Sequence, residues 1–498
     1  HVTYTEAVKL LEEHNDEFDY KVFWGCDLQT EHERYITQQI YKGLSVSGMF
    51  SFDTYNYTSN RFTKTPNTYH ATGRDANGNL LYEQTRQGTE NLAYSLSAKG
   101  NRAIYLEAAV NYRNTFGRHT VSGMMLFNQS DEINTKATNV EEALPYRFRG
   151  LAGRFTYSFD DRYFGEFNFG YNGSENFAPK NRYGPAVSAG WVISNEPFFR
   201  GATEVIQYLK LRGTWGRVGN SQISGRRFAY LATVKDTNDT SYQFGKNMDQ
   251  TYGTTAIDEY AVDVTWEIAD KTNIGLDMRL LNNKFNLQFD AFKESRKGIY
   301  LRRTSIPSYF GMINNPYGNI GKVENKGIEM SVSYANSWRD WSLSVMGNYS
   351  FNRNKVLEDD STVAYPWQKT IGNKVDQRFG LIALGLFESP EEIAAAPVQV
   401  GDTRPGDIRY KDINGDGKID EYDKVPIGWG VPEIVYGFGF SVGWKGLSLS
   451  AMFQGAAHVD AILSGEGVLP FAQGSSRGNL LSNITDRWTE ANPRQDVF

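Results

Sequence analysis

Apolar and polar residues alternate one by one along much of this chain, and the alternation persists over unusually long stretches. From residue 285 to 291 the sequence reads FNLQFDA, with polar residues between Phe, Leu, Phe and Ala. A period of two places the apolar side chains on one face of a β-strand and the polar ones on the other. The pattern predicts an all-β fold of antiparallel strands. Comparable stretches lie at residues 44–52, 106–112, 121–127, 155–159, 163–171, 209–215, 274–280, 328–334, 341–351, 436–444 and 447–453.

The connections between these stretches alternate in length. Short turns read FDDR, NSWRD and WKG, whereas long polar segments span Asn60–Thr89, Asn220–Thr251 and Val356–Pro432. The predicted strands have roughly 9–12 residues, which exceeds the mode of about 5–6 in soluble proteins and suits membrane-spanning strands. Short turns at one end and long loops at the other are typical of an outer-membrane β-barrel. A multi-domain, β-rich soluble protein is the alternative.

The composition fits a sheet with one polar and one aromatic face. Mean hydropathy is −0.52, yet 14% of the 498 residues are aromatic, and the formal net charge is −6. This mild charge argues against a nucleic-acid-binding protein, which needs a basic face. No run of about 18 apolar residues occurs, so no transmembrane helix is predicted. A membrane-spanning strand needs only about 10 residues of alternating character.

A loop of calcium-binding type, KDINGDGKIDEYDK, lies in the last long connection. It follows the template D-x-[DN]-x-[DN]-G-x5-E, in which odd-numbered positions turn oxygen atoms inward around a hard cation. Aspartate replaces glutamate at position 12, which predicts weaker binding. An acidic turn without metal is the alternative, and a bound calcium ion would have a structural role. The expected ligands are the side chains of Asp412, Asn414, Asp416, Asp420 and Asp423 and the carbonyl oxygen of Lys418.

Motifs for catalysis do not occur in the sequence, and no enzyme is predicted. The six histidines lack metal-ligand spacing, and G-x-S-x-G, Walker A and H-E-x-x-H are absent. Cys26 is the single cysteine, so no internal disulfide can form. One helix is predicted in the last long connection, where Ser389 is the N-cap, Glu392 is at the third position and Pro397 ends the helix.

Several segments resemble the SusC/RagA-like TonB-dependent outer-membrane transporters of Bacteroidetes. The most specific is GDIRYKDINGDGKIDEYDKVPIGWGVPEIVYGFGFSVGWKGLSLSAMFQGA, which contains the acidic loop. Upstream, RGLAGRFTYSFDDRYFGEFNFGYNGSENFAPKNRYGPAVSAGWVISNEPFF resembles a mid-barrel hairpin of the family, and LKLRGTWGRVGN the strand that follows. These matches run in order from about Arg149 to Asp486, and from about Glu31 onward the chain has barrel-type alternation without specific motifs. Further matches are NIGLDMRLLNNKFNLQFDAFKESRKGIYL, GKVENKGIEMSVSY and GLFESPEEI.

The resemblance implies a fold and a function. The fold is part of a transmembrane antiparallel β-barrel of about 22 strands around a plugged lumen. The function is active import of a nutrient, an oligosaccharide or a peptide, across the bacterial outer membrane. Implied partners are a SusD-like surface lipoprotein that covers the long loops, TonB as the energy source and outer-membrane lipid, in a dimer of transporter–lipoprotein pairs. We expect the acidic loop to shape the surface on which the lipoprotein docks.

The sequence departs from the full family pattern at both ends. No plug-domain motif, TonB box or carboxypeptidase-like extension is recognisable, and His1 is preceded by no signal peptide. We therefore expect residues 1–498 to be the barrel portion of a longer protein, without its plug domain and last strands. This portion should supply about 14 strands, with residues 356–432 as a long extracellular loop.

Two other functions stay open from the residues alone. One is a secreted or surface-bound, calcium-stabilised β-rich protein for binding or adhesion. The other is a glycan-cleaving enzyme, which would need a pair of carboxyl groups facing one cleft. The loop aromatics Tyr309, Tyr317 and Trp367 are candidates both for cargo contact and for loop packing. The sequence does not specify the cargo.

Overall fold

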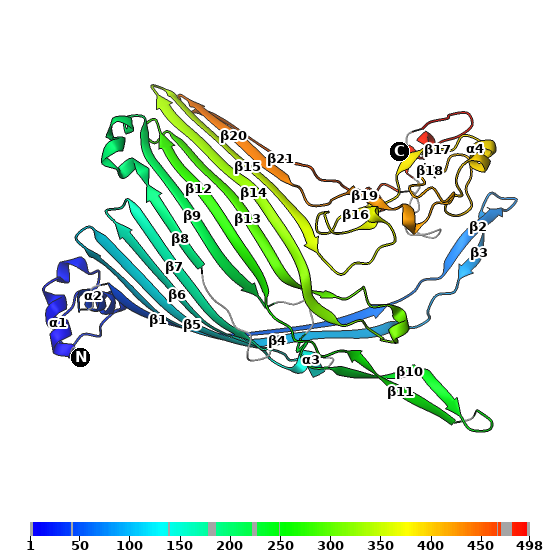
Figure 1. Ribbon diagram of the computed structural model, residues 1–498, viewed down its shortest axis with the longest axis horizontal. Helices are drawn as coiled ribbons and strands as arrows, with labels where there is room; N and C mark the ends of the chain where they lie inside the picture. Colours follow the sequence, from blue (N-terminus) through cyan, green and yellow to red (C-terminus); the bar gives the residue numbers. More distant parts are fainter. Residues whose placement is uncertain are drawn as a thin grey trace. The chain divides into compact units, whose positions relative to one another are not determined.

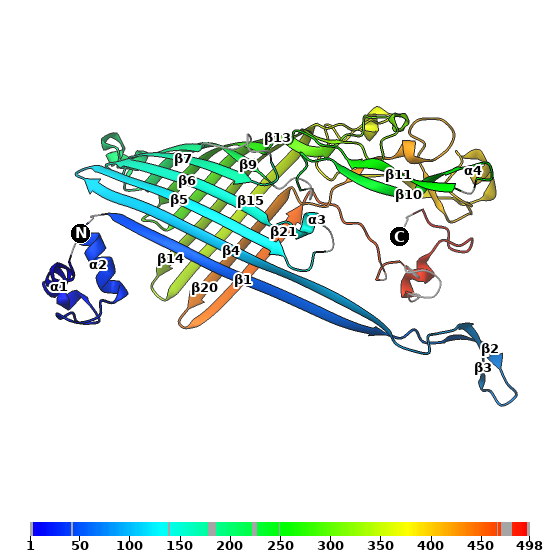
Figure 2. The same cartoon turned by 90° about the horizontal axis from the view of Figure 1, so that it is seen from below.

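The structure is a computed structural model that describes residues 3–40, 43–137, 140–177, 186–221, 227–248, 250–465, 467–469 and 481–495. Antiparallel strands dominate these residues, as Figure 1 and Figure 2 show. The chain divides into two compact units. One comprises residues 1–112, 124–153 and 170–175, and the other comprises residues 113–123, 154–169 and 176–498. None of the described helices has the length and apolar character needed to cross a membrane.

Within the described residues, thirteen strands form the main sheet, and their order in the sheet follows their order along the chain. This up-and-down order confirms the predicted fold of antiparallel strands. The strands are β1 (Leu44–Thr63), β4 (Ala93–Phe116), β5 (His119–Asn134), β6 (Tyr146–Phe159), β7 (Tyr163–Ser174), β8 (Ala186–Val192), β9 (Ile206–Asn220), β12 (Glu267–Leu280), β13 (Phe285–Arg302), β14 (Tyr317–Trp338), β15 (Trp341–Glu358), β20 (Ile434–Trp444) and β21 (Leu447–Ala457).

Two connections that the sequence suggested to be long polar loops contain hairpins. β2 (Thr68–Arg74) pairs with β3 (Leu80–Arg86), and β10 (Thr233–Phe244) pairs with β11 (Gln250–Glu259). These strands are rich in Thr, Tyr and charged residues and show no regular apolar side. Hydrophobic periodicity could therefore not reveal them.

The first residues form helices. Helix α1 (Tyr4–Glu12) begins after Thr3, whose side chain accepts a hydrogen bond from the backbone N–H of Glu6, and helix α2 (Thr30–Ile40) follows. The two helices and the segment between them enclose a small core of Val8, Leu11, Phe18, Val22 and Cys26. Outside the connection between β15 and β20, the other short helices of the described residues are η1 (Asn15–Glu17), α3 (Val140–Ala143), η2 (Ile193–Asn195), η3 (Pro197–Ala202), η4 (Ser308–Phe310) and η7 (Ser482–Asp486).

The expectation that barrel-type alternation starts near Glu31 is wrong. Glu31 lies in the first turn of α2, and the first strand of the sheet begins at Leu44. In α2 the fully buried His32 and the partly buried Tyr35 and Ile36 recur at a spacing of three to four residues. That spacing is the period of a helix and not of a strand.

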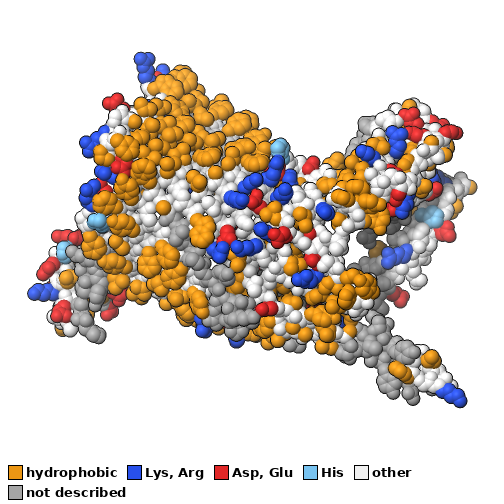
Figure 3. Space-filling view, in the orientation of Figure 1, with side chains coloured by type: hydrophobic (Ala, Val, Ile, Leu, Met, Phe, Trp, Pro, Cys, Tyr) orange, Lys and Arg blue, Asp and Glu red, His pale blue; other side chains and the backbone are white. Residues whose placement is uncertain are grey.

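The second unit pairs its strands in a register that separates apolar from polar side chains. On β14, β15 and β20, for example, Tyr334, Val345 and Phe440 lie in one row. Because successive side chains point to opposite faces, one face of these strands is almost continuously apolar. Figure 3 shows hydrophobic side chains gathered over this part of the sheet. Further rows are Ala291–Ile328–Phe351–Ile434, Phe289–Met330–Tyr349–Tyr436 and Leu287–Val332–Gly347–Phe438.

The apolar rows have the height of a membrane. They run from Trp341 opposite Trp444 to Phe351 opposite Ile434. The ten residue steps from 341 to 351 span about 34 Å along a strand. At a tilt of about 40° this is about 26 Å, against about 25 Å for the apolar band of a transmembrane barrel. Leu447 on β21 is 71% exposed in this band, as expected for a side chain that faces lipid.

The connection between β15 and β20 is an ordered insertion with its own strands and helices. β16 (Arg378–Gly380) pairs with β19 (Val425–Gly428), and β17 (Ala383–Leu386) pairs with β18 (Ile408–Tyr410). Phe387, Ile419 and Trp429 are buried within it. The insertion also contains the 3-10 helices η5 (Pro366–Gln368) and η6 (Glu421–Asp423).

The predicted helix in this insertion is confirmed. Helix α4 spans Pro390–Ala395, and the Ser389 hydroxyl accepts a hydrogen bond from the backbone N–H of Glu392 at 3.2 Å. The start predicted for the long connection, Val356, lies three residues too early, because β15 continues to Glu358.

Candidate functional site

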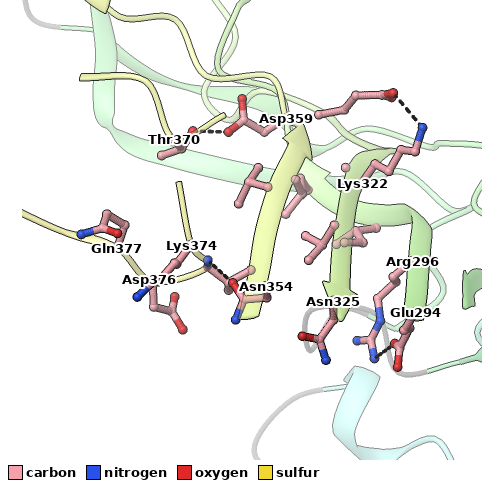
Figure 4. A pocket seen from close by; sticks show the side chains of 17 residues that line it. Glu294, Arg296, Lys322, Asn325, Asn354, Asp359, Thr370, Lys374, Asp376 and Gln377 are labelled. Atoms are coloured by element: carbon pink, nitrogen blue, oxygen red, sulfur yellow. Dashed lines mark hydrogen bonds and ion pairs between the residues drawn. The ribbon is translucent and has the colours of Figure 1, made fainter. Parts of the chain in front are cut away.

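A cavity of about 670 Å³ lies in the second unit, where the polar face of β13, β14 and β15 meets the connection that follows β15. Figure 4 shows Arg296, Asn325 and Asn354 on these strands, with the segment 374–377 nearby. Small-molecule sites typically have volumes of about 300–1,000 Å³. The cavity therefore has the size of a ligand-binding site.

Strand alternation determines which side chains reach the cavity. Glu294, Asn325 and Asn354 lie opposite one another on β13, β14 and β15, and all three line it. Each of the three is an odd number of residues away from the apolar-row members on its strand, so its side chain lies on the opposite, polar face. The sequence predicts the face on which they lie, but all three fall just outside the alternating stretches 285–291, 328–334 and 341–351.

The wall opposite the strands is the segment 370–377, which is hydrogen-bonded to β15. The Asn354 side-chain oxygen accepts a hydrogen bond from the backbone N–H of Val375 at 2.8 Å. The backbone N–H of Val356 donates to the carbonyl oxygen of Asn373 at 2.8 Å, and that of Gly372 donates to the carbonyl oxygen of Val356 at 2.9 Å. These bonds extend the edge of the strand into the connection and hold the cavity open.

A buried carboxylate also holds this wall in place. Glu433 is 2% exposed, and its Oε1 lies 2.8 Å from Nε of Arg353 and 3.0 Å from Nζ of Lys374. The hydrogen bond from Arg353, with help from Lys374, lowers the pKa of Glu433 to about 2. The Lys374 ammonium also lies over the ring of the buried Trp429, 4.6 Å from its centroid. The network joins β15, the cavity wall and the start of β20.

The cavity offers both polar and apolar contacts. Arg296 is paired with Glu294 at 3.1 Å, while Val323 and Val356 supply apolar surface. The side-chain oxygen of Asn325 is buried and has no hydrogen-bond partner among the described residues. Such an oxygen can accept a hydrogen bond from a ligand hydroxyl or N–H group once the Asn325 side chain turns to expose it to the cavity. The cavity thus suits a ligand that presents hydroxyl or amide groups beside carbon surface.

The acidic loop is shaped by hydrogen bonds to its own backbone. Asp412 accepts hydrogen bonds from the backbone N–H groups of Gly415 at 2.7 Å and Gly417 at 2.9 Å. Asp416 accepts one from the backbone N–H of Lys418 at 3.1 Å. Gly417 has φ of 85°, a left-handed conformation that favours glycine, as expected for position six of the calcium template.

Asp423 is the anchor of this loop. It is fully buried, and its two oxygens accept hydrogen bonds from the backbone N–H groups of Ile413 and Asp420, each at 2.8 Å. The ammonium of Lys418 lies 2.8 Å from Oδ2 of Asp420 and lowers the pKa of that carboxyl group. In the described part of the chain, no three His, Cys, Asp or Glu side chains are grouped to hold a metal ion.

The three aromatics expected in loops lie outside the cavity lining, and Tyr317 is not in a loop but is the first residue of β14. The ring of Tyr317 stacks on that of the buried Tyr300 at 4.8 Å, and Trp367 stacks on Tyr365 at 4.6 Å. Tyr309 is 83% exposed. Tyr317 and Trp367 therefore pack within the protein, whereas the ring of Tyr309 is accessible.

Comparisons with known proteins place this architecture in a family. A family model described as "TonB dependent receptor-like, beta-barrel" matches residues 27–425. TonB-dependent receptor P3 of Formosa agariphila is 25% identical over 503 residues, which cover 97% of this chain and 46% of that protein. TonB-dependent receptor SusC of Bacteroides thetaiotaomicron is 28% identical over 280 residues, which cover 55% of this chain and 27% of SusC. The chain thus spans about half, or less, of the length of these relatives.

A solved structure has a similar fold. The structure described as the RagAB peptide transporter superposes with a TM-score of 0.61 and 18% identity, over 84% of this chain and 46% of that chain. A separate match covers only 41 residues, 8% of this chain, which are 73% identical to part of an asparagine–tRNA ligase of Clostridium perfringens. A match that short assigns neither fold nor activity to the whole chain.

The family match and the structure agree. The matched residues 27–425 include most of the main sheet. The exposed apolar rows have the height of a membrane, and the polar face carries the cavity. The chain belongs to the TonB-dependent receptor β-barrel family and is an integral β-barrel protein of the bacterial outer membrane.

Proposed function

We propose that this chain forms barrel wall in a protein that imports a nutrient across the outer membrane and catalyses no reaction. Membership in the TonB-dependent receptor family supports import, and the family name points to TonB as the energy source. The observation that carries the proposal is the cavity on the polar face, where the Asn325 side-chain oxygen has no hydrogen-bond partner among the described residues. The exposed apolar rows argue against the alternative of a soluble adhesion protein.

The proposed cargo is an oligosaccharide or a peptide. Both classes present many hydroxyl or N–H donors, which Asn325 can accept, and both carry carbon surface that fits Val323 and Val356. The RagAB relative is described as a peptide transporter, which favours peptides. A SusD-like lipoprotein is the proposed partner, and the ordered insertion at 359–433 is the surface proposed for its docking.

Asn325→Ala is expected to weaken cargo binding about tenfold, because one hydrogen bond in a buried site is worth about 1–2 kcal/mol. Binding is measured by isothermal titration of the purified protein with maltoheptaose and, separately, with a mixture of heptapeptides. The matched control is Asn348→Ala, because Asn348 lies on the polar face of β15 outside the cavity lining. Equal losses in the two variants, or no binding of either probe, would contradict the assignment of the cavity.

We also propose that the acidic loop binds calcium as a structural ion. The side chains of Asp412, Asn414, Asp416 and Asp420 and the carbonyl oxygen of Lys418 are oxygen donors, the class that calcium prefers. Asp423 fits the role of an anchor better than that of a ligand, because its side chain is fully buried and backbone N–H groups bond both its oxygens, whereas the side chain of Asp412 is partly exposed. The Lys418 ammonium, beside Asp420, would have to turn away when the ion binds.

Removing two of the negative charges, with Asp412→Asn plus Asp416→Asn, is expected to abolish stabilisation of the insertion by calcium, because a doubly charged cation binds carboxylates more tightly than amides. At a calcium concentration 100-fold above Kd, binding stabilises a folded segment by about 2.7 kcal/mol. The measurement is hydrogen exchange of residues 398–423 with calcium and with a chelator. The control is Asp402→Asn, since Asp402 lies exposed in the same insertion. Identical exchange with and without calcium in the unaltered protein would refute the calcium site.

A further inference from the structure

Three cations lie in a row on the apolar face, directly beyond the last apolar row. Lys293, Lys326 and Arg353 lie opposite one another on β13, β14 and β15. Each is two residues from a member of the last apolar row, and no register shift intervenes. The three side chains therefore share the face of the apolar rows. The members of that last row are Ala291, Ile328 and Phe351.

The charged side chains around the cation row leave this edge of the apolar face with an excess of positive charge. Glu324 pairs with Lys293 at 2.7 Å and approaches Lys326 at 3.9 Å. Asp270 pairs with both Lys297 and Arg217 on the same face. Lys355 lies opposite Glu324, and Arg353 pairs with the buried Glu433. This set contains three more cations than carboxylates. Its members are Arg217, Lys293, Lys297, Lys326, Arg353 and Lys355, against Asp270, Glu324 and Glu433.

This arrangement does not serve the stability of the sheet. Like charges that lie directly opposite on neighbouring strands destabilise the pairing. Here Lys326 faces a cation on both sides. The side chains of Lys293 and Lys326 are 60% and 64% exposed, so both ammonium groups reach the surface. Figure 3 shows basic side chains gathered near the margin of the hydrophobic surface. The exposed positive margin is suited to an anionic partner.

We propose that this cation row binds the phosphate groups of lipids in the outer leaflet. The apolar rows face acyl chains, so the side chains one row beyond them lie at the level of the headgroups. The row is at the end of β15 that leads into the long insertion, and the short turn 339–340 is at the other end. In outer-membrane barrels the long loops are extracellular. Phosphate accepts charge-assisted hydrogen bonds from Lys and Arg.

The test compares one lipid with and without its phosphate groups. The purified protein in detergent is titrated with phosphorylated lipid A and with the same lipid after phosphatase treatment, and bound lipid is quantified by native mass spectrometry. We expect Lys293→Gln plus Lys326→Gln to weaken binding of the phosphorylated lipid about 25-fold, or about fivefold for each charge. Binding of the dephosphorylated lipid should be weaker and unchanged by the substitutions.

A matched control lies on the opposite face. Lys271 and Arg296 flank Glu294 at 3.2 and 3.1 Å, much as Lys293 and Lys326 flank Glu324. Lys271→Gln plus Arg296→Gln should leave lipid binding unchanged. Lys293→Arg plus Lys326→Arg keeps both charges and should retain binding. Unchanged binding in the Lys293 and Lys326 glutamine variant, an equal loss in the control, or inorganic phosphate binding as tightly as the lipid would overturn the proposal.

Discussion

Replacing Glu433 with glutamine is expected to loosen the wall of the cavity by about 2–3 kcal/mol. The Glu433 carboxylate accepts hydrogen bonds from Nε and Nη2 of Arg353, each at 2.8 Å, and Nζ of Lys374 lies 3.0 Å away. Glutamine keeps the shape but removes the charge, so both cations lose their partner. Hydrogen bonds to charged groups contribute about 1.5–3 kcal/mol each.

The measurement is hydrogen exchange at two amides of the wall. The N–H groups of Gly372 and Val375 are bonded to β15, so their exchange reports opening of the segment. We expect about 30- to 150-fold faster exchange in Glu433→Gln. The control is Glu358→Gln, because Glu358 is 62% exposed and pairs with Lys322 at 3.3 Å, a contact worth about 0–1 kcal/mol. Equal acceleration in both variants would show that Glu433 does not hold the wall.

The same residue predicts a pH dependence. The Arg353 hydrogen bond lowers the pKa of Glu433 from 4.5 to about 2. A carboxyl group whose pKa is lowered by folding stabilises the protein fully above its ordinary pKa, and that stabilisation is lost as the pH falls through the folded value. The exchange rates of wild type and Glu433→Gln should therefore differ above about pH 5 and converge as the pH approaches 2. A difference that persists below this value would exclude the ionised carboxylate as its cause.

The second large effect is expected from Val345→Arg, which should impair folding into the membrane. Val345 lies near the middle of the apolar rows, opposite Tyr334 and Phe440. Arginine facing lipid near the midplane of a barrel destabilises it by about 2–4 kcal/mol. The neighbouring Ser344 faces the polar side, so Ser344→Arg is expected to change stability far less. The stability of both variants is measured as the free energy of unfolding from lipid vesicles in urea. An equal loss of stability in Val345→Arg and Ser344→Arg would contradict the assignment of the two faces.

The sequence by itself determined every strand of the main sheet except β8 among the described residues, and it determined which side chains share a face. The alternation at residues 328–334 and 341–351 falls within β14 and β15, and the short turn between them is where the sequence suggested. Helix α4 could be predicted equally well, because Ser389 and Pro390 start the helix through contacts within a few residues of backbone. These features depend on residues close together in the chain, so local patterns contain the information.

The polar hairpins and the N-terminal helices could not be predicted from local sequence patterns in the same way. β10 and β11 pair without a regular apolar side, and α2 is stabilised by a small core that only forms when Phe18 and Val22 pack against it. The acidic loop was recognised from its spacing, but the role of Asp423 as a buried backbone anchor was not. Its burial depends on the packing of the insertion around it.

Only the tertiary structure decided where the cavity and the cation row lie. Asn325 reaches a cavity because a segment some fifty residues later folds back on β15, and Glu433 meets Arg353 across a separation of 80 residues. Likewise, Lys293, Lys326 and Arg353 form a row because two strand registers bring them together. The alternation of apolar and polar residues determines the face on which each side chain lies. Which residue lies opposite it on the neighbouring strand depends on the register of the two strands, and no single stretch of sequence determines that register.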